Sequence, residues 1–188
     1  MNKILKTLLL FLIIILLSLV MYNAFNIEEK ILVKLYPKKF EEYVYKYSEK
    51  LDIDPMLTFA IIKTESNFKE DAVSSSGAIG LMQLMEKTAK EQARKLDIEY
   101  TKESLYNAET NLKIGLNYFN TLLDYYKQNY ILAFTAYNAG LGNVQKWINE
   151  GKIKSDGSDI ENIPFKETNM YVRKIIKNYE MYKRLYKE

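Results

Sequence analysis

Apolar residues recur at helical spacing along most of the chain, and no long run alternates between apolar and polar positions. Between Lys38 and Leu51, for example, apolar side chains lie three and four residues apart, which places them on one face of a helix. Asp54 and Pro55 then fit the N-cap and the first position of a second helix. This spacing predicts helices over residues 38–51, 55–66, 80–96, 109–128, 130–138 and 168–187.

The segments between these helices are predicted to be loops and connectors. Residues 67–79 and 151–164 form loops, residues 100–108 a connector, and residues 144–149 a further helical turn or two. The chain has only seven Gly and three Pro, few for a protein built from short strands and tight turns. The hydrophobic content of 48% is sufficient for a packed core. The predicted fold class is therefore all-α.

The N-terminal segment has the pattern of a membrane span. Lys3 and Lys6 precede the uncharged run 7–25, whose nineteen residues would form a helix about 28 Å long, against a hydrocarbon core of about 30 Å. A cleavable signal peptide is the alternative. Its cleavage site would need small residues at positions −3 and −1, but here only Ala24 is small, and the bulky Tyr22 lies two positions before it. We therefore predict a transmembrane signal anchor over residues 1–25. Residues 26–37 would be a juxtamembrane connector, helical in part.

The positions of the basic residues predict the orientation of this anchor. Lys3 and Lys6 should stay on the cytoplasmic side of the cytoplasmic membrane, which places residues 26–188 on its extracytoplasmic face. The net charge of the whole chain is +3, and these two lysines account for most of it. The rest of the chain is close to neutral and gives no reason to propose a nucleic-acid partner.

The chain contains no Cys and no His, which limits its possible chemistry. Ser-His-Asp and Cys-His catalysis are excluded, and so are zinc sites built on His or Cys ligands. Any acid–base catalysis must use carboxylates, Lys or Tyr.

Glu65 is the acidic residue that the pattern singles out. It follows Leu57 and Ile61 at intervals of four on the predicted 55–66 helix, so it shares their apolar face. It also lies at the C-terminal end of that helix. Burial and the negative end of the helix dipole both disfavour an ionised carboxylate, and a carboxyl kept protonated near neutral pH can act as a general acid. The alternative is a solvated carboxylate at a frayed helix end.

Three sequence blocks in order strengthen the prediction for Glu65. They are Glu65-Ser66 with Ser74 and Gly77-Ala78-Ile79-Gly80-Leu81-Met82-Gln83, then Ala136-Tyr137-Asn138, then Glu167-Thr168 with Tyr171. In these blocks the chain resembles the soluble lytic transglycosylase family over residues 41–186. The resemblance implies a helical domain like that of goose-type lysozyme, which we place at residues 38–188.

The departures from the family pattern are local. Family members usually have Pro where this chain has Glu70, Glu86 and Leu141. Without these prolines, the unfolded chain has more conformational freedom, but no reacting group is lost. They bear on loop geometry and leave the reaction class unchanged.

The resemblance also implies a reaction and a site. Glu65 would protonate the glycosidic oxygen between N-acetylmuramic acid and N-acetylglucosamine in peptidoglycan, and would then deprotonate the muramyl C6 hydroxyl to give a 1,6-anhydro sugar. No metal or organic cofactor is needed. Residues expected to contact the glycan strand or to shape the cleft are Ser74, Gln83, Met85, Tyr137, Asn138 and Glu167.

Two other functions remain open from the sequence. A muramidase would deliver water to the same bond and would need a second carboxylate, for which Glu86 and Asp71 are the candidates. A membrane-tethered wall-binding protein with an inactive site would have no use for a carboxyl on an apolar face, so Glu65 argues against it.

Overall fold

The computed structural model describes residues 2–186, and in that range all side chains except those of residues 4–7 and 23–26. The chain divides into two compact units, Met1–Pro37 and Lys38–Glu188. Parts of the predicted anchor at 1–25 and the last two residues of the predicted domain at 38–188 lie outside the described residues. Each unit is described separately below.

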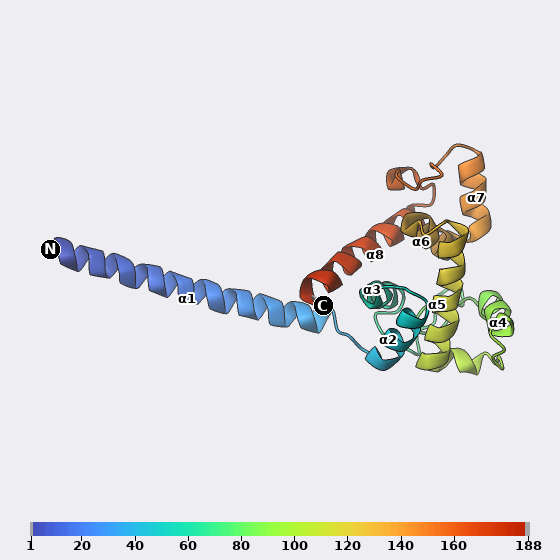
Figure 1. Ribbon diagram of the computed structural model, residues 1–188, viewed down its shortest axis with the longest axis horizontal. Coiled ribbons are helices and arrows are strands. Elements are labelled where there is room, and N and C mark those ends of the chain that lie inside the picture. Colours follow the sequence, from blue (N-terminus) through green and yellow to red (C-terminus); the bar gives the residue numbers. More distant parts are fainter. Residues whose placement is uncertain (1, 187–188) are drawn as a thin grey trace. The chain divides into compact units, whose positions relative to one another are not determined.

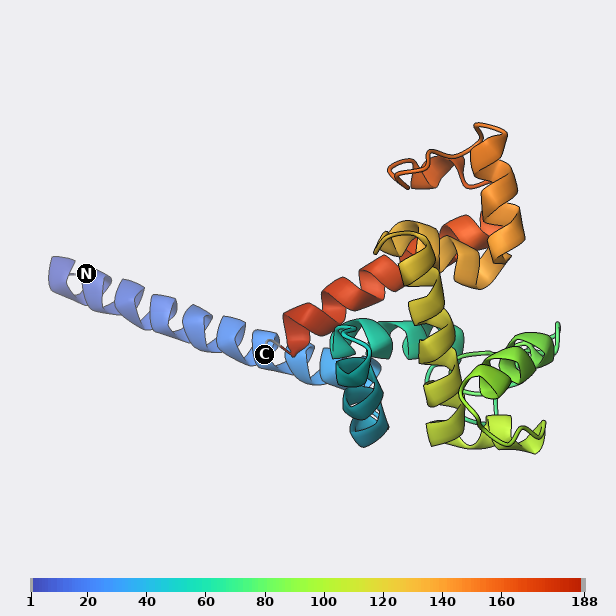
Figure 2. The same cartoon turned by 45° about the vertical axis from the view of Figure 1, so that its right-hand side comes forward.

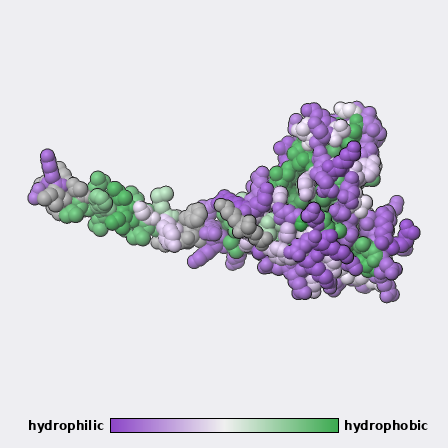
Figure 3. All heavy atoms as spheres, viewed as in Figure 1, coloured by the Kyte–Doolittle hydropathy of each residue, from purple (hydrophilic) through white to green (hydrophobic). Residues whose placement is uncertain are grey.

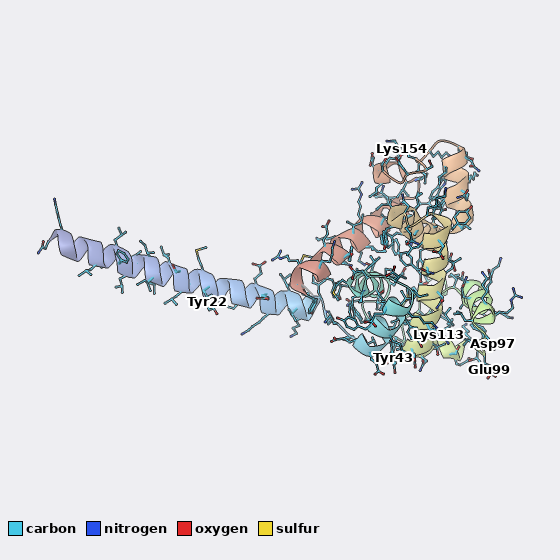
Figure 4. The ribbon with its side chains drawn as sticks, in the orientation of Figure 1. Tyr22, Tyr43, Asp97, Glu99, Lys113 and Lys154 are labelled. Atoms are coloured by element: carbon cyan, nitrogen blue, oxygen red, sulfur yellow. The ribbon has the colours of Figure 1, made fainter. Side chains whose placement is uncertain are left out.

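The first unit is a single long helix, α1 (Lys3–Leu35). It continues without a break through most of the predicted connector. Its segment Leu8–Leu35 is long and apolar enough to cross a membrane, although a signal sequence can have the same properties. Apolar side chains gather over one stretch of α1 in Figure 3, and side chains such as that of Tyr22, which is 65% exposed, project from the helix in Figure 4.

The second unit is all-α, as predicted, and no strand occurs among residues 2–186. Its seven α-helices are α2 (Glu41–Lys50), α3 (Pro55–Glu65), α4 (Glu86–Lys95), α5 (Ala108–Tyr125), α6 (Tyr130–Ala139), α7 (Leu141–Asn149) and α8 (Lys166–Leu185). Two short 3-10 helices, η1 (Glu103–Tyr106) and η2 (Ile160–Asn162), lie in the predicted connector and loop. The exposed Asp97 and Glu99 follow α4, and Lys154 lies in the loop after α7 (Figure 4).

Helix α3 is the buried centre of this unit. Apolar residues lie on all its sides, so other elements must cover it completely. Helix α8 makes the most extensive helix–helix contact with α3, and α2 covers another part (Figures 1 and 2). Asp54 begins α3 as predicted, because its carboxylate accepts a 2.7 Å hydrogen bond from the Met56 N–H. The other oxygen of Asp54 accepts a 2.5 Å bond from the Tyr179 hydroxyl of α8.

The prediction of a helix beginning at Gly80 is wrong. Residues 80–85 form a tight turn instead, in which Ile79 and Leu84 exchange two backbone hydrogen bonds of 3.0 Å. Gly80 and Gln83 have positive φ angles of 80° and 48°, which a right-handed helix cannot accommodate. The helix starts only at Glu86. Helix α7, in contrast, starts three residues earlier than predicted.

Asn111 of α5 holds this turn in place. Its side-chain oxygen accepts a 2.8 Å hydrogen bond from the Met82 N–H, and its amide nitrogen donates 2.9 Å bonds to the carbonyls of Ile79 and Leu105. Asn111 is fully buried, and a Cβ on Gly80 would collide with it. The glycine in the Gly-Leu-Met-Gln block is therefore required by this close approach.

We expect Asn111→Ala to destabilise the fold strongly. The change leaves the buried Met82 N–H and the Leu105 carbonyl without partners, whereas the Ile79 carbonyl keeps its bond from the Leu84 N–H. Each unpaired group costs about 1–3 kcal/mol, so the free energy of unfolding should fall by at least about 2 kcal/mol. Denaturant unfolding measures this loss. The control is Asn120→Ala on the same helix, whose only side-chain bond is an exposed one of 3.4 Å. Equal effects of the two substitutions would contradict the role assigned to Asn111.

Candidate active site

Glu65 is the last residue of α3, and its carboxyl lies in a largely apolar setting. The side chain retains some solvent exposure, yet protein atoms surround most of the carboxyl group. Leu57 and Ile61, on the same face, are buried as predicted. Burial raises the pKa of Glu65 from 4.5 to about 7, and a hydrogen bond from Tyr171 and the charge of Lys174 partly oppose this rise.

Helix α8 supplies the polar groups around Glu65. The Tyr171 hydroxyl donates a 2.5 Å hydrogen bond to Oε1 of Glu65. Lys174 lies one turn further along α8, where its Nζ donates a 3.2 Å bond to the backbone carbonyl of Thr64. Burial, followed by the negative charge of Glu65, holds the pKa of Tyr171 well above its usual range. Tyr171 therefore remains a neutral donor while the carboxyl titrates.

Gln83 and Ser74 hold the loop that follows α3. The Gln83 side-chain nitrogen donates bonds of 3.1 Å to the Ala72 carbonyl and 2.9 Å to the Gly80 carbonyl. The Ser74 hydroxyl accepts a 3.0 Å bond from the Ala78 N–H and lines neither pocket described below. Both residues thus fix the loop conformation, and Gln83 also faces a pocket.

A pocket of about 230 Å³ brings four predicted site residues together. Gln83, Met85, Tyr137 and Asn138 line it, with Tyr118 at one wall. Met85 is 46% exposed and presents an apolar surface. The Tyr137 hydroxyl donates a 2.8 Å hydrogen bond to the Met82 carbonyl, so the bond to Glu65 comes from Tyr171 and not from Tyr137. Burial, and next the charge of Glu65, raise the pKa of Tyr137.

A second pocket of about 520 Å³ lies along α8. It contains Asn138 and the exposed Glu167, together with Thr64, Met170, Tyr171 and three basic residues, Arg173, Lys174 and Lys177. Asn138 lines both pockets, and its side-chain oxygen accepts a 2.7 Å bond from the Thr168 hydroxyl. Tyr171 of this pocket bonds to Glu65, which also acts on Tyr137 of the other pocket. Glu65 lines neither pocket itself, but it bonds to a tyrosine of one pocket and acts on a tyrosine of the other.

The candidates for a second catalytic carboxylate do not act on Glu65. In the described part of the chain, the groups that shift the pKa of Glu65 are Tyr171 and Lys174, and neither is a carboxylate. Burial raises the pKa of Tyr100 and the charge of Glu86 raises it further, while Asp71 is exposed in its loop. Among residues 2–186, no three His, Cys, Asp or Glu side chains come together as metal ligands would.

Tyr171 and Lys174 were not among the predicted site residues. Tyr171 belongs to the third sequence block, but its spacing on the predicted last helix matched an ordinary packing position. Its hydroxyl bonds to Glu65, which lies 106 residues earlier in the sequence. Helical spacing within α8 could show that Tyr171 and Lys174 lie one turn apart, and only tertiary packing could show which residue they face.

Comparison with known proteins identifies the family of this chain. Residues 42–160 match the family described as the transglycosylase SLT domain. The chain belongs to this family. Its all-α fold, like that of lysozyme, is therefore the fold of an SLT domain, and the resemblance noted in the three sequence blocks is confirmed.

The relatives of the chain include soluble and membrane-bound lytic murein transglycosylases. The soluble lytic murein transglycosylase of Salmonella typhimurium is 33% identical over 152 residues, which cover 79% of this chain and 23% of the relative. Membrane-bound lytic murein transglycosylase C of Serratia proteamaculans is 28% identical, with coverage of 72% and 42%. A solved structure of lytic transglycosylase Slt from Pseudomonas aeruginosa, an inactive glutamate-to-glutamine mutant, has a TM-score of 0.73 and 33% identity, and the match covers 79% of this chain and 24% of that one. This chain thus spans about a quarter of the length of the soluble relatives.

We expect Glu65→Gln to stabilise the SLT domain at alkaline pH. The pKa of Glu65 is about 7 in the folded protein and 4.5 at its ordinary value. Between pH 4.5 and pH 7, the folded protein therefore holds a proton on Glu65 that the unfolded chain has lost. Its stability should therefore fall as pH rises through this window, by about 2–3 kcal/mol between pH 5 and pH 8. Glutamine retains an oxygen for Tyr171 and undergoes no ionisation.

The measurement is the difference in unfolding free energy between variant and wild type at the two pH values. The matched control is Glu70→Gln, since that carboxylate is exposed and loses little hydration on folding. The burial of Glu65 would be contradicted by a Glu65→Gln difference that does not grow from pH 5 to pH 8.

Proposed function

We propose that this chain is a lytic transglycosylase that cleaves peptidoglycan strands, with Glu65 as acid and then base. The observation that carries the proposal is a single buried carboxyl with a pKa of about 7, bonded to Tyr171 of one pocket and close enough to act on Tyr137 of the other. A group with this pKa is protonated often enough to donate a proton and ionised often enough to accept one. The names of the relatives supply the reaction class.

The proposed reaction has two steps on one carboxyl. Protonated Glu65 donates its proton to the oxygen that links N-acetylmuramic acid to N-acetylglucosamine, and this bond breaks as the muramyl N-acetyl oxygen stabilises the cation. The Glu65 carboxylate then removes the proton of the muramyl C6 hydroxyl, whose oxygen bonds to the anomeric carbon. Tyr171 and Lys174 stabilise the carboxylate between the steps, since both favour its charged form.

A transglycosylase fits the surroundings of Glu65 better than a muramidase does. Hydrolysis with two carboxylates needs a partner within about 5–9.5 Å of the acid. Neither Glu86 nor Asp71 influences the charge of Glu65. The inactive glutamate-to-glutamine mutant of the Pseudomonas aeruginosa relative supports a glutamate as an essential residue, which both reactions require.

The glycan strand would lie along the pocket of about 230 Å³. There Met85 would pack against a sugar face, while Tyr137 and Asn138 would shape the subsite that holds the acetamido group. Gln83 and Ser74 would contribute mainly by holding the loop, and Glu167 would orient groups at the edge of the other pocket.

We further propose that α1 anchors the chain in the cytoplasmic membrane. Its apolar segment, its two N-terminal lysines and the membrane-bound Serratia proteamaculans relative support this assignment. Residues 1–25 would be the span and residues 26–37 the connector. Residues 38–188 would then meet peptidoglycan on the extracytoplasmic face, with the N-terminus inside.

The first test is the product of the reaction. The full chain in detergent, incubated with purified peptidoglycan, should release muropeptides one water molecule lighter than the hydrated products, as anhydro ends require. Glu65→Gln should lower this release at least about 1000-fold, because the only acid–base group is lost. Mass spectrometry identifies the products. Reducing muramyl ends in place of anhydro ends would make the chain a muramidase.

The second test is the pH dependence of kcat/KM. The first step needs protonated Glu65, so kcat/KM should fall about tenfold per pH unit above pH 7. Tyr171→Phe removes a hydrogen bond that lowers the pKa of Glu65, so the fall should begin at a higher pH. Tyr179→Phe is the matched control, because Tyr179 bonds to Asp54 at the other end of α3. An unchanged midpoint in Tyr171→Phe would remove this tyrosine from the mechanism.

A further inference from the structure

A row of aromatic side chains leads away from the pocket of about 230 Å³. Tyr137 and Tyr118 both line this pocket, and their ring centroids are 5.3 Å apart. Burial raises the pKa of Tyr118, and the nearby Glu91 and Tyr126 raise it further, so Tyr126 is the next member of the row. Its ring centroid is 5.0 Å from that of Tyr125. The row therefore begins in the pocket and ends beyond it, at Tyr125.

Helix α5 places Tyr125 on the same face as Tyr118. The two residues are seven positions apart, which is two turns, or about 10 Å along the helix axis. Helices α4 and α7 lie on the same side of α5 in both views, with α7 beside the end of α5 (Figures 1 and 2). Glu91 of α4 acts on Tyr118, and Gln145 of α7 donates a 3.4 Å hydrogen bond to the Tyr126 hydroxyl. This face of α5 thus continues from the pocket with a helix on either side of its path.

Tyr125 offers an open ring at the end of the row. Its side chain is 52% exposed, whereas Tyr126 beside it is only 8% exposed and supports it from the interior. A Tyr ring is a flat apolar surface with a hydroxyl at its edge. The face of a pyranose ring presents C–H groups framed by hydroxyls, so the two surfaces match in shape and polarity. Tyr125 therefore suits an uncharged sugar ring.

We propose that Tyr125 binds a remote sugar of the glycan strand, beyond the pocket of about 230 Å³. The inference rests on the proposed function and names a further part of the strand that the domain would hold. The strand is a chain of similar rings, so a segment bound in the pocket brings the following rings along the same face of α5. Strands long enough to reach Tyr125 then bind more tightly than short fragments.

The distance of Tyr125 from the reacting bond determines which kinetic constant it changes. A contact with an unreacting sugar is equally strong in the bound substrate and in the transition state, so it lowers KM and leaves kcat unchanged. A residue that merely supported the fold around Glu65 would change kcat, and would do so for every substrate length.

The test compares peptidoglycan tetrasaccharides with uncross-linked strands several times as long, with KM expressed per glycosidic bond. The full chain in detergent should cleave the long strands with a KM about fivefold lower, because only they reach the ring. Tyr125→Ala should raise the KM for long strands about fivefold, with kcat and the KM for tetrasaccharides unchanged. Tyr125→Phe keeps the ring and should stay within about twofold of the wild type.

The matched control is Tyr106→Ala, since Tyr106 is 39% exposed on η1 and lines neither pocket. This variant should keep the preference for long strands. An unchanged KM for long strands in Tyr125→Ala would overturn the inference, and so would an equal rise for tetrasaccharides or an equal effect of Tyr106→Ala. Each of these results leaves the proposed function intact if anhydro products still form. Absence of anhydro products from both substrates would overturn the proposed function, and this inference with it.

Discussion

The antiparallel contact between α3 and α8 is the constraint on which the rest of the site depends. Because α3 is apolar on all sides, it has no stable position until neighbouring helices cover it. The 2.5 Å bond from Tyr179 to Asp54 joins α8 to the start of α3, and the 2.5 Å bond from Tyr171 to Glu65 joins it to the end. Between them, Asn178 donates a 2.8 Å bond to the Thr64 hydroxyl. The same packing that buries α3 thus places a donor beside its terminal carboxyl.

In this arrangement, burial and the neighbouring polar groups shift the pKa of Glu65 in opposite directions. Full burial of a carboxyl can raise its pKa by several units, whereas a hydrogen bond and a nearby cation lower it. The sum, a pKa of about 7, is an intermediate that neither effect would produce alone. A carboxyl that must give and then regain a proton needs this intermediate value. The lower stability at alkaline pH follows directly, because the folded state must then hold a partly desolvated charge.

Particular residues show how far the sequence could predict this structure. The burial of Glu65 was predictable, because local helix geometry places it on the same face as Leu57 and Ile61, which had to face the core. The turn at Gly80 was not, since Leu81, Met82 and Leu84 have the apolar character of a helix core. They are buried because Asn111, almost thirty residues later, holds the turn against α5. Tyr171 was missed for the same reason, as its partner lies across the fold.

Lys174 connects the two pockets electrostatically. It lines the basic pocket, and its charge lowers the pKa of Glu65. A carboxylate bound beside Lys174 would cancel part of that charge at the distance of Glu65, and the pKa of Glu65 would rise. Glu65 would then hold its proton more firmly while the anionic group occupies the pocket, which is the state that the first step of the proposed reaction requires. Once the bond is broken, Tyr171 still stabilises the carboxylate that must act as the base. In the proposed reaction, Lys174 would thus couple the charge in this pocket to the protonation of Glu65.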